Sequence, residues 1–284
     1  MMEEAYMQKI TNEHYDMDVF IDPYNKRLRI EDYRGDLHKI IDKALDISTH
    51  YNAEKLIFIC RREHFSILIE RAFQCEAMID YFYRGSAAYY FTKYFSIDRK
   101  KSDDWLVEDG IINNVSKLAR NKMKQPIPSG YELRKIVEND AEQLAKLYQE
   151  VFRVYPTPLH EPEYIKKSIK KGTIYYGFFR DGSIVSAASA EVNTHYNNAE
   201  LTDCATVPHY RKFGFMKFLL EKLEEELRKQ GVFCTYSIAR AQSFGMNAAL
   251  YQLGYSYRGR LLNNCYIFEN LENMNMWVKD LSKG

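Results

Sequence analysis

The sequence has almost no net charge and few tryptophans. Its 284 residues carry 40 Lys and Arg against 39 Asp and Glu, so the formal charge at pH 7 is +1. Without a net positive field, DNA, RNA and anionic membranes are not expected as main partners. Hydrophobic residues make up 46% and charged residues 28%, which is ordinary globular composition, so a disordered or collagen-like chain is excluded.

Long apolar runs are missing as well. The longest are only a few residues, as in Leu56–Cys60, whereas a membrane-spanning helix needs about 20. After Met1 no basic segment followed by an apolar one is readable as a secretory signal. We therefore expect a soluble, cytoplasmic protein.

Closely spaced cysteines are absent too. Zinc sites and redox dithiols use C-x-x-C pairs, and here the smallest gap is fifteen positions (Cys60, Cys75, Cys204, Cys234 and Cys265). No metal constellation and no Ser-His-Asp arrangement is readable. We expect reduced, mostly buried thiols and no bound metal.

Tyrosine, by contrast, is abundant, with 23 residues against 16 phenylalanines and 2 tryptophans. Packing in strands accounts for many of them, because they fall in segments that alternate like strands. These are Tyr81, Tyr83, Tyr89, Tyr90, Tyr94, Tyr175, Tyr176 and Tyr266.

A linker near the middle divides the chain. The segment from Lys117 to Lys124 is basic, and the Pro126-Ile127-Pro128-Ser129-Gly130 stretch cannot continue a helix. We place a boundary there, which gives an N-terminal α/β domain (1–126) and a second domain (127–284). Strand and helix signals alternate at short spacing in the second domain, which is typical of an α/β fold.

The second domain opens with a strand, two helices and an antiparallel meander. Asp181-Gly182 predicts a tight turn between strands 173–180 and 183–192, because both residues tolerate positive φ. A third strand, 199–207, runs into Pro208. An amphipathic helix begins near Phe215 and ends at Gly231. A strand, a loop with Arg211 and Gly214, and a helix N-terminus together form an anion site suited to phosphate or pyrophosphate.

That segment resembles the acyl-CoA loop of the GCN5-related N-acetyltransferase (GNAT) superfamily, Gln/Arg-x-x-Gly-x-Gly/Ala. Arg211 and Gly214 match its first and fourth positions, whereas Met216 departs from the small sixth residue. Downstream, residues 247–255 resemble the second signature of the superfamily, an Asn-containing helix that ends in Tyr and a Gly-aromatic pair. The resemblance implies a GNAT acyltransferase fold, a mixed α/β sheet, in the C-terminal half and acetyl-CoA as co-substrate. The implied cofactor-binding residues are Cys204, Ala205, Thr206, Val207, Arg211, Lys212, Phe213, Gly214, Phe215, Met216 and Asn247.

Segments 155–158, 201–208 and 263–270, together with the extra N-terminal domain, resemble the β-lysine N6-acetyltransferases more closely. The resemblance implies an enzyme that makes N6-acetyl-β-lysine, a compatible solute. Acetyltransferases of lysine, polyamines or protein lysine are the alternatives, and a catalytically silent acyl-CoA sensor is a further one. The expected partner is a small-molecule amine, and a homodimer is left open.

The resemblance also implies catalytic roles. An ammonium group with a pKa near 10.4 must lose a proton before it attacks a thioester. Glu200 is the expected base, directly or through a water, and the alternative is an exposed strand carboxylate. Asp203, expected on the opposite face of a regular strand, is an alternative base or an ammonium ligand, and a bulge would change its facing. His195 is expected in a surface turn.

Backbone amides near 204–206 are expected to polarise the acetyl carbonyl. Tyr251 matches the residue that protonates the departing thiolate, with a core aromatic as the alternative. Tyr155, Thr157 and Arg240 are expected to contact the amine substrate.

Residues 1–126 carry no comparable motif. Their order of helix, strand, helix, strand, turn and strand repeats the end of the second domain, with Ile69–Phe73 in the place of Tyr251–Tyr255. We interpret this half as a degenerate GNAT-like copy that lacks the Arg-x-x-Gly loop and the tyrosine. An unrelated cap or dimerisation module is the alternative.

Overall fold

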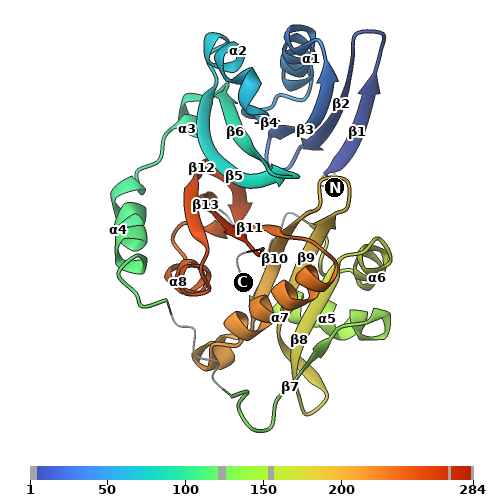
Figure 1. The fold of residues 1–284 in the computed structure, drawn as a ribbon, viewed down its shortest axis with the longest axis vertical. Coiled ribbons are helices and arrows are strands. Elements are labelled where there is room, and N and C mark those ends of the chain that lie inside the picture. Colours follow the sequence, from blue (N-terminus) through green and yellow to red (C-terminus); the bar gives the residue numbers. More distant parts are fainter. Residues whose placement is uncertain (1–4, 121–125, 153–156, 268–269, 283–284) are drawn as a thin grey trace.

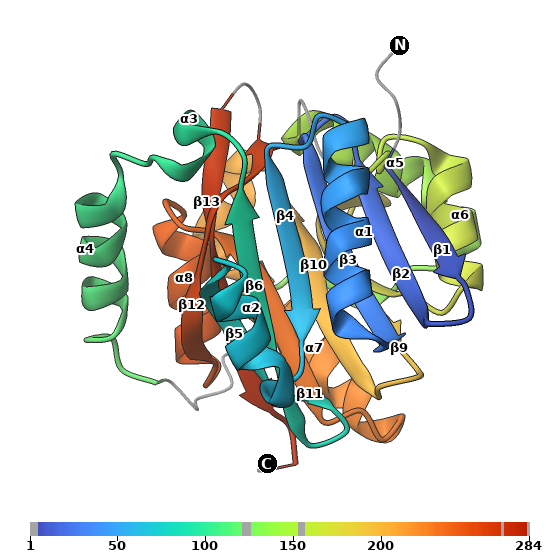
Figure 2. The ribbon, with the colours of Figure 1, turned by 90° about the horizontal axis from the view of Figure 1, so that it is seen from above.

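The computed structural model describes residues 5–120, 126–152, 157–267 and 270–282. Within these ranges thirteen strands form one mixed sheet, and helices cover its faces (Figures 1 and 2). The strands and the first two α-helices of the N-terminal half (residues 5–120) lie at the top of Figure 1, and the C-terminal half (described residues from 126 on) lies below. Helix α4 (Trp105–Val115) of the N-terminal half lies beside helix α8 (Phe244–Gln252). No helix among the described residues is long and apolar enough to cross a membrane.

The N-terminal half contains six strands and four α-helices: β1 (Tyr6–Thr11), β2 (Tyr15–Asp22), β3 (Arg27–Gly35), α1 (Leu37–His50), β4 (Lys55–Cys60), α2 (Phe65–Glu70), β5 (Gln74–Tyr83), β6 (Ser86–Tyr94), α3 (Ile97–Lys100) and α4 (Trp105–Val115). The sequence predicts a hairpin over 19–30, a helix over 36–51 and a strand over 55–60, and β2 with β3, α1 and β4 lie there. The pattern missed β1, α3 and α4.

The described part of the C-terminal half contains seven strands and four α-helices: β7 (Glu132–Lys135), α5 (Ala141–Val151), α6 (Pro162–Lys170), β8 (Ile174–Arg180), β9 (Ser183–Asn193), β10 (Asn198–Thr206), α7 (Phe215–Lys229), β11 (Cys234–Arg240), α8 (Phe244–Gln252), β12 (Ser256–Ile267) and β13 (Asn270–Asp280). The 3-10 helix η3 (Pro208–Phe213) connects β10 to α7.

The two halves share one strand order. Across the sheet it runs β1-β2-β3-β4-β6-β5 in the first and β8-β9-β10-β11-β13-β12 in the second. Each half has an antiparallel meander, a helix, a parallel strand, a second helix and a closing hairpin, and the parallel pairs are β3 with β4 and β10 with β11. This repeat agrees with the order expected from the sequence. That the first half is a degenerate copy stays a prediction.

The halves join where β5 meets β12. Gly259 pairs with Ala77, and a Cβ on Gly259 would lie 2.2 Å from the backbone oxygen of Glu76. Only glycine permits this approach, since its φ is also +122°. Apolar side chains from both halves cover the junction, among them Ile57, Ile79, Leu261 and Met276. The sheet is therefore continuous through the junction.

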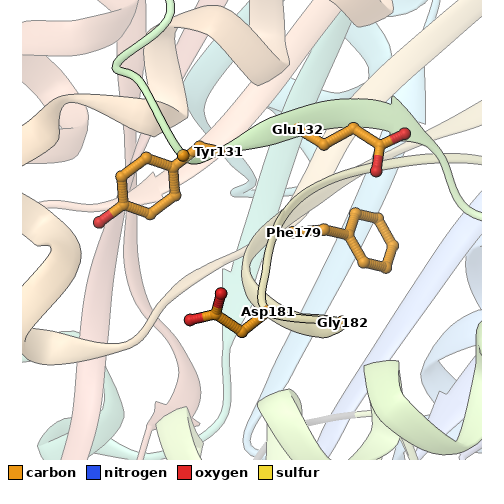
Figure 3. A pocket seen from close by; sticks show the side chains of 6 residues that line it. Tyr131, Glu132, Phe179, Asp181 and Gly182 are labelled. Carbon is orange, nitrogen blue, oxygen red and sulfur yellow. The ribbon is translucent and has the colours of Figure 1, made fainter.

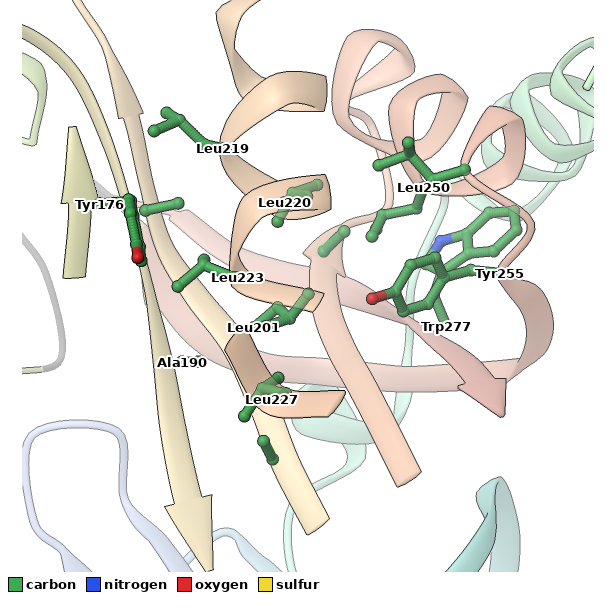
Figure 4. Packing of buried hydrophobic residues seen from close by; sticks show 14 of the residues in the cluster. Tyr176, Ala190, Leu201, Leu219, Leu220, Leu223, Leu227, Leu250, Tyr255 and Trp277 are labelled. Atoms are coloured by element: carbon green, nitrogen blue, oxygen red, sulfur yellow. The ribbon is translucent and has the colours of Figure 1, made fainter. Parts of the chain in front are cut away.

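Helix α7 supplies much of the core of the C-terminal half. Its apolar residues recur at helical spacing, and Leu219, Leu220, Leu223 and Leu227 are fully buried against the sheet (Figure 4). Each such leucine contributes about 1.5–3 kcal/mol of burial free energy. This packing holds the N-terminus of α7 in a fixed place beside β10.

Two features differ from the expectation. The Asn263-Asn264 pair predicts a turn between strands 256–262 and 265–269. Instead, β12 continues through it to Ile267, with a register shift between Leu261 and Cys265 and a φ of +42° at Asn263. Helix α4, within the predicted first domain, packs on α8, and its Val115 joins the core of the C-terminal half. The division at the linker therefore does not separate the packing of the two halves.

Candidate active site

Strands β10 and β11 separate partway along their length. They pair in parallel only from Asn198 to Glu200, opposite Cys234 to Tyr236, although the strands continue to Thr206 and Arg240. On its other side β10 is bulged between Thr202 and Ala205, where Asp203 has a φ of +51°. The bulge increases local twist and turns β10 away from its parallel neighbour. Backbone groups of β10 beyond Glu200 are consequently left without β11 partners.

A pocket of about 850 Å³ opens at this separation. Its walls come from β10, β11, the N-termini of α7 and α8, the end of α5 and the N-terminal half. The lining includes Phe20, Arg27, Arg29, Thr157, Tyr164, Glu191, Glu200, Asp203, Cys204, Thr206, Arg211, Gly214, Met216, Lys217, Arg240 and Gln252. This volume suits a small ligand together with part of a second one.

One end of the pocket is built for an anion. Gly214 adopts the left-handed conformation, with φ +66°, that turns the chain from η3 into α7, and a Cβ there would meet no atom within 4 Å. No side chain caps α7 and its first turn holds no acidic residue, so its N–H groups and dipole are not neutralised from within the helix. Arg211 and Lys217 line the same end. The residues present therefore fit a pyrophosphate.

Glu200 lies on the pocket wall beside a second carboxylate. It pairs in register with Glu191 of β9, and the two side chains therefore share one face of the sheet. Burial, Glu191 and Asp203 raise the pKa of Glu200 to about 8, although Arg29 opposes the shift. A carboxyl group with such a pKa can accept a proton near neutral pH.

Asp203 lies on the same face as Glu200, because the bulge breaks the alternation. Its Oδ2 accepts a hydrogen bond of 2.8 Å from Ser189 Oγ, and Ser189 pairs with Thr202, two residues along β10 from Glu200. The opposite facing expected of a regular strand is therefore wrong here, and the bulged alternative holds. Both carboxylates line the pocket.

The other predicted residues divide into two groups. Those that line the pocket are Cys204, Thr206, Arg211, Gly214, Phe215, Met216, Thr157 and Arg240. Those that do not are Ala205, Val207, Lys212, Phe213, Asn247 and Tyr251. Tyr155 lies outside the described residues. His195 is exposed, as expected, in the segment between β9 and β10.

Asn247 does not line the pocket, and its side chain forms hydrogen bonds inside the protein. Its fully buried amide donates to the carbonyls of Arg240 and Ser243 at 2.9 and 2.8 Å. Its oxygen accepts from Asn275 at 3.0 Å and from the Trp277 indole at 2.8 Å. These bonds use both amide hydrogens and both oxygen lone pairs, which leaves nothing for a cofactor and corrects the expected contact.

Tyr251 lies on α8 with its hydroxyl turned to α4, where it donates 2.8 Å to the carbonyl of Ser116. The Arg120 guanidinium lies 4.7 Å from the centre of its ring. An acid role for Tyr251 requires this hydrogen bond to be given up, and that role stays a prediction.

Arg240 forms an ion pair, and its side chain remains 42% exposed. Its Nε and NH2 donate to both oxygens of Glu272, at 2.6 and 2.5 Å. The bidentate pair fixes the guanidinium at the pocket wall and neutralises its charge.

Sequence patterns do not reveal the residues that the N-terminal half brings to the pocket. Phe20, Arg27 and Arg29 come from β2 and β3, more than 160 positions before Glu200. A charged residue on a strand with alternating polarity looks like a solvated one, and only the join between β5 and β12 brings it here. Glu191 also looks like a solvated strand residue, and only the register between β9 and β10 places it opposite Glu200.

Among the described residues, a second and smaller pocket has fewer charged side chains in its lining. This shallow hollow of about 340 Å³ lies between β7 and the β8–β9 turn and shares no lining residue with the large pocket (Figure 3). Among the described residues no three His, Cys, Asp or Glu side chains are grouped to hold a metal ion.

Comparisons with known proteins agree with this geometry. Residues 141–255 match the model of the acetyltransferase (GNAT) family. The N-acetyltransferase YodP of Bacillus subtilis is 40% identical over 92% of this chain and 94% of its own length. The β-lysine N(6)-acetyltransferases of Methanosarcina mazei and Methanococcus maripaludis are 37% and 30% identical. They cover 72% and 96% of this chain and 83% and 99% of their own lengths. The resemblance noted in the sequence is thereby confirmed: the chain is an N-acetyltransferase that belongs to the GNAT family.

Proposed function

We propose that the protein transfers an acetyl group from acetyl-CoA to the terminal N6 amine of β-lysine. Acetyl-CoA is the acyl donor of the family, and two of the relatives are named for this activity. Acetylation removes one ammonium charge and leaves a neutral zwitterion, which suits the expected role as a compatible solute. The single observation that carries the proposal is the carboxylate pair Glu191 and Glu200, which lines the same pocket as the anion site of α7.

The anion end of the pocket is proposed to hold the CoA pyrophosphate. The N–H groups of the first turn of α7 and the Arg211 guanidinium would bind its oxygens, and Gly214 would leave the backbone accessible. When bound, acetyl-CoA supplies an activated acetyl thioester. The separation of β10 from β11 leaves backbone N–H groups between Cys204 and Thr206 near the pocket, where they would polarise a carbonyl oxygen.

Glu200 is proposed to take the proton from the substrate ammonium. That group has a pKa near 10.4 in water, so only a small fraction is free amine at neutral pH. With its own pKa raised to about 8, Glu200 is a stronger base than an ordinary carboxylate. Asp203 and Glu191 would attract the ammonium to this wall. Tyr251 is the predicted proton donor to the departing thiolate.

The test is a panel of acceptors incubated with acetyl-CoA, with CoA release followed over time. The proposal predicts the highest kcat/KM with β-lysine and lower values with lysine, spermidine and a basic peptide. Equal turnover of lysine and β-lysine would contradict the β-lysine assignment. CoA binding without turnover of any amine would indicate a sensor instead.

Two variants test the assigned roles in the same assay. Glu200→Gln should lose about 10²–10⁴-fold in kcat/KM, the range that general-base catalysis supplies. Tyr251→Phe should lower kcat if the hydroxyl protonates the thiolate. A rate within a few-fold of wild type in either variant would remove that residue from the mechanism.

A further inference from the structure

Arg29 has the same place in its half of the molecule as Glu200 has in the other. Arg27 to Ile30 pair in parallel with Lys55 to Phe58, so Arg29 is the third residue of that ladder. Glu200 is the third residue of the ladder between β10 and β11. The repeat therefore brings a cation from one half and a carboxylate from the other to a single pocket.

Among the described residues, the N-terminal half does not repeat the anion site of α7 at the corresponding helix. The N-terminus of α1, which corresponds to that of α7, is capped by Asp36, whose carboxylate accepts from the N–H groups of His38 and Lys39 at 3.0 and 3.3 Å. A negative side chain there occupies the N–H groups that a pyrophosphate would need. What this half contributes to the reaction is thus its part of the pocket wall.

Arg29 is held in position and still accessible. Its Nε donates 2.5 Å to Glu31, and its NH2 contacts the same carboxylate oxygen. The guanidinium carbon lies 4.9 Å from the centre of the Phe20 ring, which fixes the plane of the group. The side chain remains 24% exposed, and the pair with Glu31 uses Nε and NH2 and does not involve NH1. A planar, oriented guanidinium of this kind suits a carboxylate.

We propose that Arg29 binds the carboxylate of the acceptor, so that the N-terminal half selects diamino acids over plain diamines and polyamines. This inference rests on the proposed function. The reactive amine lies several bonds from the carboxylate in such an acceptor, and opposite charges in one pocket can hold both ends at once. A polyamine would instead place a cation against Arg29, which disfavours it.

The experiment compares two acceptors that differ only in the carboxylate, namely β-lysine and 1,4-diaminopentane. Wild type should prefer β-lysine. Arg29→Gln should lower kcat/KM for β-lysine about 10–100-fold, mainly through KM, since a hydrogen bond to a charged group is lost. The value for 1,4-diaminopentane should change only through the effect of the Arg29 charge on Glu200, which both acceptors share, so the preference for β-lysine over 1,4-diaminopentane should fall about 10–100-fold. Arg29→Lys should give an intermediate loss for β-lysine.

Two further variants control for the loss of positive charge and for the unpaired Glu31 carboxylate. Arg34→Gln removes the same charge from an exposed position on β3 outside the pocket lining and should keep the wild-type preference. The double variant Arg29→Gln/Glu31→Gln removes both members of the ion pair, so no carboxylate is left unpaired. It should lose the preference as the single variant does.

The outcomes are distinct. Equal loss on both acceptors would show that Arg29 only balances charge in the pocket, and an unchanged preference would show that it does not contact the carboxylate. Either result contradicts this inference while the proposed function stands. A wild-type protein that acetylates neither acceptor contradicts the proposed function itself.

Discussion

The carboxylate pair at the pocket wall gives a measurable pH dependence. In the Glu191→Gln variant the neighbour that raises the pKa of Glu200 loses its charge. The pKa of Glu200 should then fall. Since Glu200 is the proposed base, the rise of kcat/KM with increasing pH should move to lower pH in the variant.

The size of the shift follows from the register. Residues directly opposite in an antiparallel pair have Cβ atoms about 5 Å apart, so their carboxylates lie roughly 6 Å apart. Two charges at about 6 Å repel by about 3 kcal/mol at an effective dielectric constant near 20 and by about 0.7 kcal/mol in water. Glu191 is exposed, which favours the lower part of that range. We expect a shift of about 1 pH unit, since one unit corresponds to about 1.4 kcal/mol.

The assay is kcat/KM for the amine acceptor across neutral and alkaline pH. The acceptor titrates identically with both enzymes, so the difference between their profiles reports on Glu200. Glu132→Gln, an exposed carboxylate on the edge strand β7, is the matched control and should leave the profile unchanged. An acid limb that stays in place in Glu191→Gln would refute the coupling between the two carboxylates.

Three further variants test other parts of the structure. Because the folded-state pKa of Glu200 is raised from 4.5 to about 8, its ionisation destabilises the fold as pH rises through that window. Glu200→Gln should therefore gain in Tm relative to wild type between pH 5 and pH 9 in thermal melts, and parallel curves would contradict the raised pKa. Asn247→Ala should lower the free energy of unfolding by about 2–4 kcal/mol in urea titrations, because buried groups such as the Trp277 indole lose their hydrogen-bond partner. The KM for acetyl-CoA should change little. A large rise in that KM at unchanged stability would restore Asn247 as a cofactor contact. Gly214→Ala should weaken CoA binding in calorimetry and cost about 1–2 kcal/mol of stability, since alanine resists its left-handed conformation. Gly110→Ala, in the interior of α4 with no atom near its Cβ, should instead be neutral or stabilising.

Local signals were sufficient to predict the loop and helix N-terminus at the anion end of the pocket. The strand before Pro208, the Arg211 and Gly214 spacing and the apolar periodicity of α7 depend on neighbours a few residues apart, and the structure places them as expected. Hydrogen-bonding partners depend on distant residues. The sequence around Asn247 matches a signature, but strand β13 decides that its oxygen meets Asn275 and Trp277.

The acceptor end could not be predicted because it is assembled across the sheet. The bulge that turns Asp203 toward Glu200 is a departure from alternation, and alternation is the only signal a strand offers. Arg29 reaches the pocket only because Gly259 lets β12 approach β5. The repeated strand order was visible in the sequence, whereas the way the two copies face each other was not.

The most direct test of the account is to incubate the protein with acetyl-CoA and β-lysine and identify the product by mass spectrometry and NMR. The account predicts one N6-acetyl-β-lysine for each CoA released, and a rate at least about 100-fold lower in Glu200→Gln. Acetylation at the other amine, or an undiminished rate in the variant, would contradict it.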